Sequence, residues 1–170
     1  DKLVTGVQTC ALPISLTAWW ADGHRREVVE TGRRVMLGKI ALVVLTLVSA
    51  AGAITALGDT LFPSGSFAEG FREDFAATAN FLVRLRVIHP ALAVAGAVYL
   101  LWLVLPEMKL QRSGKLTGLA AAIAGGVLMQ TVLGVANAML AAPVALQLPH
   151  LLLADLVWIG AVLYVSESGA

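Results

Sequence analysis

Long apolar runs dominate this sequence and restrict its fold more than any other feature. They cover residues 40–57, 81–105, 116–142 and 144–165. A helix needs about 20 mainly apolar residues to cross the roughly 30 Å hydrocarbon layer of a membrane. Charged residues make up only 14% of the chain, against about 25% in soluble domains. We therefore expect an all-α integral membrane protein, a four-transmembrane-helix bundle whose second helix is stopped by Pro106.

The charges between these runs predict how the helices are oriented. Lysine and arginine are frequent in residues 25–39 and 109–115, whereas acidic residues outnumber basic ones in residues 58–80. Because cytoplasmic loops carry the excess of basic residues, we expect the basic connections and the C-terminus in the cytoplasm of a bacterial cell. Residues 58–80 would then lie outside the cell membrane. The net charge of +1 provides no basic surface for nucleic acid.

Three phenylalanines recur at helical spacing in the expected outer connection. They are Phe67, Phe71 and Phe75, with glycine and proline before them. This spacing predicts a short amphipathic helix that lies on the outer membrane surface. A plain linker is the alternative.

The first residues of the chain look foreign to the rest. Residues 4–14 resemble a translated sequencing adapter, so we expect 1–14 to be an artefactual N-terminus. A natural terminus or signal peptide is the alternative. We expect residues 15–34 to hold the tail of a truncated helix and a cytoplasmic loop, before a membrane domain over 35–165. Cys10 is the single cysteine, which excludes an internal disulfide.

Two histidines, His89 and His150, stand inside apolar runs. Ionisable groups in a membrane span cost free energy, so each is a candidate functional residue. Both lie near the outer end of the second helix of a hairpin, as in a duplicated helical pair, at a depth of about 10 Å. Haem iron accepts two axial imidazoles, and helix bundles can hold it between them. The pattern predicts haem ligation by this pair, with interhelical hydrogen bonding as the alternative.

Polar residues near His89 suggest contacts for haem propionates. Arg86 precedes His89 by three residues and shares its helix face, so its guanidinium could bind a carboxylate with two hydrogen bonds. Arg84 lies on another face, where snorkelling to the interface is an equal alternative. Small residues stand at the same depth in the other two helices, Gly52 and Gly134 among them. They suit a flat macrocycle and close helix packing equally.

The last apolar run carries two further polar residues. Gln147 precedes His150 by three residues and could donate a hydrogen bond to a propionate or a water. Asp155 lies on a different face near mid-membrane. We expect it to make a structural polar contact with Asn137 or Gln130, with a proton-relay role as the alternative.

Several of these motifs resemble the haem A synthase family. They are GAITALGDTLFP at 52–63, RLRVIHP at 84–90, QTVLG at 130–134 with Asn137, and LPHLLLADLVW at 148–158. In order, they are similar to the fifth to eighth helices of that family and the outer loop after the fifth. The similarity extends over essentially the whole chain from residue 15 onward.

The resemblance implies a fold and a function. The family has eight helices in two pseudo-symmetric halves and oxidises a methyl group of haem O to the formyl group of haem A for terminal oxidases. Its C-terminal half holds a haem b cofactor, while its N-terminal half binds haem O and carries a catalytic glutamate. This chain would be the C-terminal half, with His89 and His150 as axial ligands of haem b and Arg86, Arg84 and Gln147 as further cofactor contacts.

The sequence also departs from the family pattern. The N-terminal half is absent, and Arg86 stands where the substrate half has its carboxylate. No catalytic residue is therefore expected in this half, and the fragment should be inactive alone. The paired cysteines that some members carry in outer loops are missing from residues 58–80. Expected partners are haem O in the missing half and membrane lipid, with haem O synthase and a second copy of the chain as further candidates.

Two other functions compete with this interpretation. A membrane b-type cytochrome with two histidine ligands would act only in electron transfer, and the fold alone does not distinguish it from a synthase half. A haem-free transporter fragment or assembly factor would tolerate the loss of both histidines.

Overall fold

The computed structural model of the protein describes residues 32–62, 66–76, 81, 86–110, 114–141 and 143–168. In this part of the chain the helices are α2 (Gly32–Leu61), α3 (Phe67–Asp74), α5 (Ile88–Leu110), α6 (Gly114–Met139) and α7 (Val144–Ser168). The expectations for residues 1–31, including the artefactual terminus and the truncated helix, lie outside the described residues, as does Arg84.

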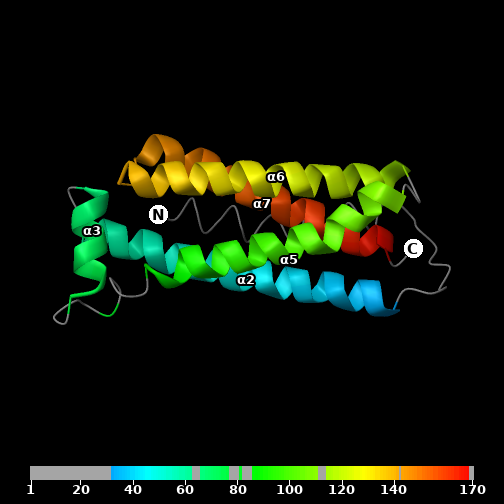
Figure 1. Ribbon diagram of the computed structural model, residues 1–170, viewed down its shortest axis with the longest axis horizontal. Helices are drawn as coiled ribbons and strands as arrows, with labels where there is room; N and C mark the ends of the chain where they lie inside the picture. The colour runs from blue at the N-terminus through cyan, green and yellow to red at the C-terminus, as the bar shows by residue number, and fades with distance from the viewer. Residues whose placement is uncertain are drawn as a thin grey trace.

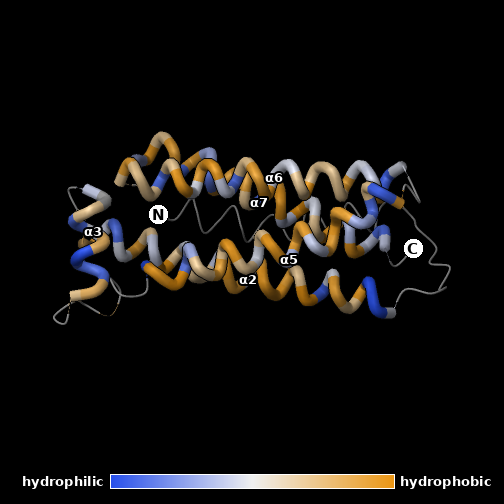
Figure 2. Tube along the Cα trace, in the orientation of Figure 1, coloured by the Kyte–Doolittle hydropathy of each residue, from blue (hydrophilic) through white to orange (hydrophobic). Residues whose placement is uncertain are grey.

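Four of these helices, α2, α5, α6 and α7, are long and apolar enough to cross a membrane. Figure 2 shows hydrophobic residues along most of their lengths and hydrophilic residues mainly toward their ends. A helix satisfies its backbone hydrogen bonds internally, so it can lie in hydrocarbon. The apolar side chains on its surface are also more stable in hydrocarbon than in water. The prediction of an all-α membrane protein with four spans is confirmed.

The four long helices form a closed ring. α2 packs against α5 and α7, and α6 packs against the same two helices, which run side by side with them in Figure 1. α5 and α7 therefore occupy diagonally opposite corners, as do α2 and α6. The turn between α6 and α7 is tight, and Ala141 adopts a left-handed conformation there, with φ of 54°.

Helix α5 extends beyond the proline that was expected to stop it. It runs through Pro106 to Leu110, because an internal proline removes only one backbone hydrogen bond directly and neighbouring helices can hold the chain in place. Glu107, the next residue, is only 4% exposed. Its Oε1 lies 3.0 Å from Nη1 of Arg34 on α2. This ion pair ties the last turns of α5 to the start of α2.

The packed core lies in the half of the bundle away from α3. Leu100 and Val104 of α5 meet Ile123 and Val127 of α6 there, with Val157 of α7. By contrast, none of the described residues 88–95, 128–139 and 144–154 is buried. Helix packing is therefore tight at one end of the bundle and looser at the end that α3 adjoins (Figure 1).

Helix α3 confirms the helix that the phenylalanine spacing predicts. Ser66 caps its N-terminus by accepting a hydrogen bond from the backbone N–H of Glu69 at 3.3 Å. The rings of Phe71 and Phe75 pack against each other with centroids 5.0 Å apart, and both side chains remain mostly exposed. That α3 lies on a membrane surface stays a prediction.

Candidate functional site

His89 lies in the first turn of α5 and is half-buried against α2. Its Nδ1 is 3.2 Å from the backbone oxygen of Val48. A carbonyl oxygen only accepts hydrogen bonds, so Nδ1 carries the proton and Nε2 keeps its lone pair. Metal-binding histidines are commonly fixed in this way, through their other ring nitrogen. This contact leaves the Nε2 lone pair of His89 available to a metal.

His150 lies in the second turn of α7 and has a different environment. Its Nε2 is 3.3 Å from the side-chain nitrogen of Gln130 on α6. Its Nδ1 is buried and has no hydrogen-bond partner among the residues that the structure describes. Nε2 is available in His89 but has a polar contact in His150. Nδ1 is hydrogen-bonded in His89 but has no partner in His150 within the described part of the chain.

Each histidine ring packs against a glycine of the long helix that precedes its own. A Cβ atom at Gly52 would lie 3.0 Å from Cε1 of His89, and one at Gly134 would lie 3.2 Å from Cε1 of His150. Both distances are shorter than ordinary carbon–carbon contacts. The two hairpins therefore share one device, in which a glycine on the first helix allows the imidazole of the second helix to approach the backbone.

The two histidines stand at the same end of the bundle on diagonally opposite helices, α5 and α7. No group of three or more His, Cys, Asp and Glu side chains suited to a metal ion occurs among the described residues. A bare ion needs three or four protein ligands, whereas haem iron needs only two. The donor set of His89 and His150 therefore fits haem iron.

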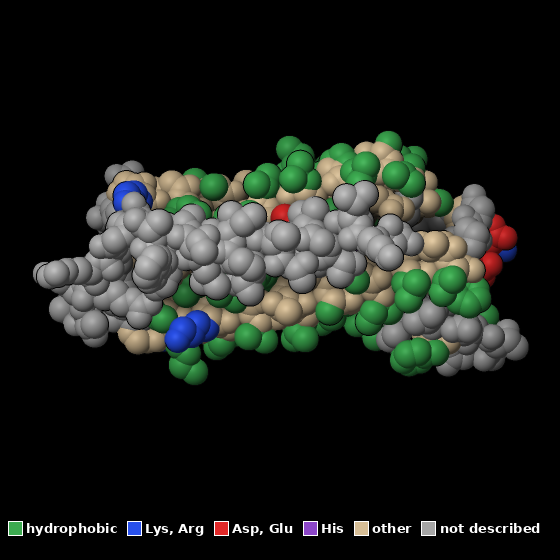
Figure 3. Space-filling model, turned by 180° about the vertical axis from the view of Figure 1, so that it is seen from behind, with side chains coloured by type: hydrophobic (Ala, Val, Ile, Leu, Met, Phe, Trp, Pro, Cys, Tyr) green, Lys and Arg blue, Asp and Glu red, His purple; other side chains and the backbone are tan. Residues whose placement is uncertain are grey.

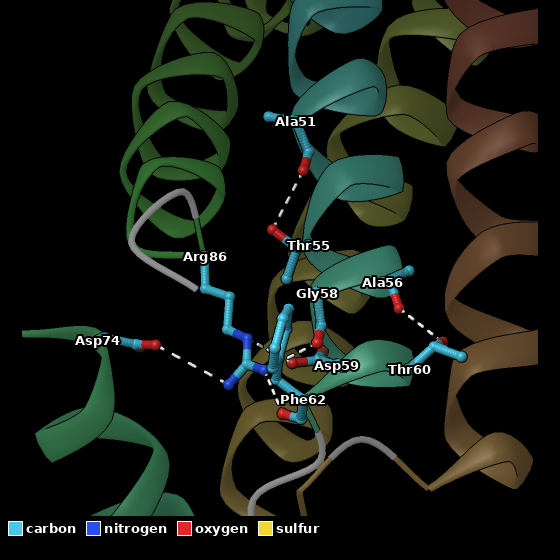
Figure 4. A network of polar contacts seen from close by, with 9 residues as sticks. All are labelled: Ala51, Thr55, Ala56, Gly58, Asp59, Thr60, Phe62, Asp74 and Arg86. Carbon is cyan, nitrogen blue, oxygen red and sulfur yellow. Dashed lines mark hydrogen bonds and ion pairs between the residues drawn. The ribbon is translucent and has the colours of Figure 1, made fainter. Parts of the chain in front are cut away.

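Arg86 lies just before α5 and is 7% exposed. Its Nη2 donates to the backbone oxygens of Gly58 and Phe62, at the C-terminal end of α2 (Figure 4). Its Nε lies 3.0 Å from Oδ1 of Asp59, and its Nη1 lies 3.9 Å from Oδ1 of Asp74 on α3. The guanidinium supplies a donor to the Phe62 carbonyl at the helix end and a second donor to the Gly58 carbonyl, which already accepts the Phe62 N–H at 2.8 Å. In this structure Arg86 joins α2, α3 and the start of α5.

Burial raises the pKa of Asp74 above its ordinary value, and this outweighs the lowering by Arg86. Asp59 and Glu73 add to the increase through their negative charges. Proximity to the guanidinium therefore does not make Asp74 a strong ion-pair partner. Its distance to Arg86 is also the longest of the four contacts.

Gln147 and Asp155 are the two other polar residues that the sequence singles out in α7. Gln147 lies one turn before His150 in α7, and its backbone N–H donates to Pro143 at 3.1 Å. Asp155 is 8% exposed, but the expected contact with Gln130 or Asn137 does not occur among the described residues. The reason is geometric, because Gln130 is directed toward His150, while Asp155 lies on another face, nearer the packed core.

Two contacts of the histidines were not found by sequence reasoning. The carbonyl of Val48 leaves no side-chain signature, and Gln130 was considered only as a partner of Asp155. The repeat of the two helical hairpins could have indicated both contacts. Val48 and Gln130 each stand four residues before the glycine that contacts the histidine, and so one turn away on the same helix face.

The comparisons with known proteins identify the family of the chain. Residues 3–162 match the model of the COX15-CtaA family, which is described as a cytochrome oxidase assembly protein. The chain belongs to this family. Its membership connects it with cytochrome oxidase assembly and haem A biosynthesis, and the resemblance noted from the sequence is thereby confirmed.

Curated relatives of this family member occur in two strains of Thermus thermophilus. Both relatives are named protoheme IX farnesyltransferase and are 39% identical to the chain over 150 residues. The match covers 86% of this chain but 24% of each relative. The chain therefore spans about a quarter of the length of these relatives. No solved structure matches the chain.

Proposed function

We propose that the chain is the C-terminal, cofactor-binding half of a haem A synthase and holds haem b between His89 and His150. The observation that carries this proposal is the orientation of His89, whose Nδ1 is bonded to the Val48 carbonyl while Nε2 stays available. The matching position of His150 on the diagonal helix supplies the second ligand. Family membership makes haem the relevant metal group.

The residues around the pair have complementary roles in this proposal. Gly52 and Gly134 allow the imidazoles to approach α2 and α6, and the Val48 carbonyl fixes the tautomer of His89. The apolar surfaces of the four helices exclude water and so raise the strength of every polar contact at the site. Bound haem would supply one-electron redox chemistry there.

Arg86, Arg84 and Gln147 are proposed as contacts for the haem propionates. Arg86 makes hydrogen bonds to two carbonyls of α2 and ion pairs with Asp59 and Asp74, so it would have to exchange one of these partners for a propionate. Asp74 is the one to exchange, because it is the most distant at 3.9 Å and burial disfavours its charged form. Propionate binding would then loosen the contact between Arg86 and α3.

The parent protein would oxidise a methyl group of haem O to the formyl group of haem A. The residues for that reaction, including the haem O site, would lie in an N-terminal half, and the half described above would exchange electrons with it. The name of the Thermus relatives, protoheme IX farnesyltransferase, supports a haem O synthase as a functional partner. Membrane lipid and a second copy of the chain are further proposed partners.

The proposed setting is the bacterial cell membrane, with the histidines toward the outer leaflet and the C-terminus in the cytoplasm. On the face shown in Figure 3, acidic side chains gather at the α3 end, where a basic side chain is also visible, and further basic side chains appear near the other end. This polarity supports the orientation, since basic residues remain on the cytoplasmic side.

A reduced-minus-oxidised visible spectrum of the detergent-purified, haem-supplied chain tests the proposal. We expect a low-spin b-type spectrum that disappears in both His89→Ala and His150→Ala. The exposed Thr46, whose hydroxyl bonds only within α2, provides the control variant Thr46→Val, which should keep the spectrum. A well-folded chain without haem, or a spectrum that survives both histidine substitutions, would refute the haem assignment.

A further inference from the structure

We infer that Gln130 is a positioning residue that occupies Nε2 of His150 and makes this histidine the exchangeable ligand of the pair. His89 would be the permanent ligand. The inference rests on the proposed haem site and adds an order to its assembly. It also assigns a role to a side chain that lies in the bundle interior without any other described partner.

The first support is the asymmetry of the two histidines. His89 has its proton fixed at Nδ1 by a backbone carbonyl, so its Nε2 lone pair is ready for a metal. His150 has its contact at Nε2 instead, 3.3 Å from the Gln130 amide nitrogen. Iron and Gln130 cannot both occupy this nitrogen. His150 is therefore available as a ligand only after the Gln130 side chain has rotated away.

The second support is that the polar groups around His150 are incompletely satisfied. Oε1 of Gln130 and Nδ1 of His150 are both buried without a hydrogen-bond partner. A buried polar group without a partner raises the free energy of its conformation. The Gln130–His150 contact is also long for a hydrogen bond. It is therefore weak enough to be exchanged for a stronger interaction.

The hairpin repeat gives the third support. Val48 and Gln130 occupy equivalent positions, four residues before Gly52 and Gly134. In the first hairpin this position contributes a backbone oxygen, which stays with its helix. In the second hairpin it contributes a flexible side chain. The same architecture thus contains one rigid and one movable histidine partner.

It follows that the site should assemble in two steps. His89 would bind iron first, which leaves a five-coordinate, high-spin centre. His150 would bind second, after Gln130 has moved, and complete a six-coordinate, low-spin centre. The Gln130 contact slows the second step and weakens its product, because it stabilises the conformation in which His150 is not available.

Stopped-flow mixing of oxidised haem with the detergent-purified chain tests this order. The wild type, Gln130→Leu and Gln130→Ala are compared through the conversion of the high-spin to the low-spin spectrum. Asn137→Leu is the matched control, because it removes an amide from the same face of α6 that has no hydrogen bond to either histidine in the described structure.

We expect both Gln130 variants to convert roughly twofold faster than the wild type, which corresponds to the loss of one weak hydrogen bond. The Asn137 variant should convert at the wild-type rate. Haem-loaded Gln130 variants with unchanged or slower conversion would overturn the inference but leave the proposed function intact. If the folded wild type shows no low-spin spectrum at all, the proposed function itself fails and the inference fails with it. The Ala variant keeps the test decisive if the Leu variant does not fold.

Discussion

The two halves of the bundle are built for different purposes. In the half away from α3, large apolar side chains such as Ile123 and Val104 are fully buried. Glycines lie at helix contacts in both halves, but Gly52 and Gly134 face imidazoles, whereas Gly126 and Gly160 face the apolar side chains of Val157 and Ile123. Close packing of apolar side chains stabilises a fold, whereas the histidine half directs half-buried polar groups between its helices. The comparison indicates that the first half maintains the bundle and the second half binds.

Each half also joins α2 to α5 through an arginine, and the two junctions differ. Arg34 pairs with the buried Glu107 at the packed end. Arg86 divides its donors among carbonyls of α2 and the carboxylates of Asp59 and Asp74 at the histidine end. A single ion pair fixes one geometry, while a guanidinium with several acceptors can exchange one of them. The histidine end is therefore the end that can rearrange.

The largest effect is expected from filling the histidine half. Gly52→Leu and Gly134→Leu place a side chain where the imidazole lies, since even a Cβ atom would come within 3.0 Å and 3.2 Å of Cε1. We expect low-spin haem per folded chain to fall more than about tenfold, because the low-spin centre needs both axial ligands in their geometry. Reduced-minus-oxidised spectra of the purified protein measure it. Gly118→Leu, on α6 with open space around it, should retain full haem content.

The converse experiment removes packing from the other half. Ile123→Ala creates a cavity at a residue that is 1% exposed, and we expect a loss of about 2–5 kcal/mol of stability. Thermal unfolding in detergent measures it, with the exposed Leu128→Ala as control. Haem per folded chain should not change. A variant that keeps its stability but loses haem would contradict the division between the two halves.

Much of this division follows from the sequence, but not all of it. The long apolar runs predict the four spans, and His89 and His150 stand out because ionisable groups are rare in such runs. The backbone acceptor at Val48 and the contact of Gln130 with His150 depend on how each helix is rotated about its axis. Rotation is set by packing at the opposite end, and weakly amphipathic membrane helices give little signal for it.

Arg86 shows the same limitation at the level of a single side chain. Its position three residues before His89 predicts a shared helix face, yet the described α5 begins at Ile88. Arg86 therefore lies before the helix, where it reaches the end of α2. The prediction that Pro106 ends the helix was also wrong, since α5 continues to Leu110, where tertiary contacts hold it. Local sequence rules are least reliable where long-range contacts decide.

A smaller effect is expected from the junction at the packed end. Glu107→Gln retains the shape of a side chain that is 4% exposed but removes the charge that pairs with Arg34. Because Arg34 is partly exposed and can rehydrate, we expect a loss of about 1–2 kcal/mol. Thermal unfolding measures this loss, and the conservative substitution Lys115→Gln at the start of α6 is its control. A shift in the haem spectrum without a change in stability would contradict the view that this ion pair stabilises the packed half.

The smallest effect concerns pH at the histidine end. Burial raises the folded-state pKa of Asp74, so the folded chain binds a proton more tightly than the unfolded chain. The contact between α3 and the rest of the bundle should accordingly be strongest below the ordinary pKa of an aspartate. It should weaken as the pH rises through the raised pKa of Asp74. Arg86, Asp59 and Glu73 all act on this group.

Limited proteolysis near α3 at pH 4 and pH 7 measures this change. We expect cleavage to increase toward pH 7 in the wild type, by a factor of about two or three, because the charged carboxylate of Asp74 is partly desolvated in the folded chain. In Asp74→Asn the pH dependence should disappear. Greater protection at pH 7 in the wild type would mean that the ion pair with Arg86 outweighs the cost of burial.

Hydrogen–deuterium exchange of the chain with and without added haem tests the central claim most directly. The account predicts that haem slows exchange in residues 88–95, 128–137 and 144–154, where His89, Gln130 and His150 lie, since binding stabilises the segments that it contacts. Exchange in the packed residues 100–107 and 120–127 should not change. Haem-induced protection that is confined to the packed half, or that is absent from both halves, would contradict it.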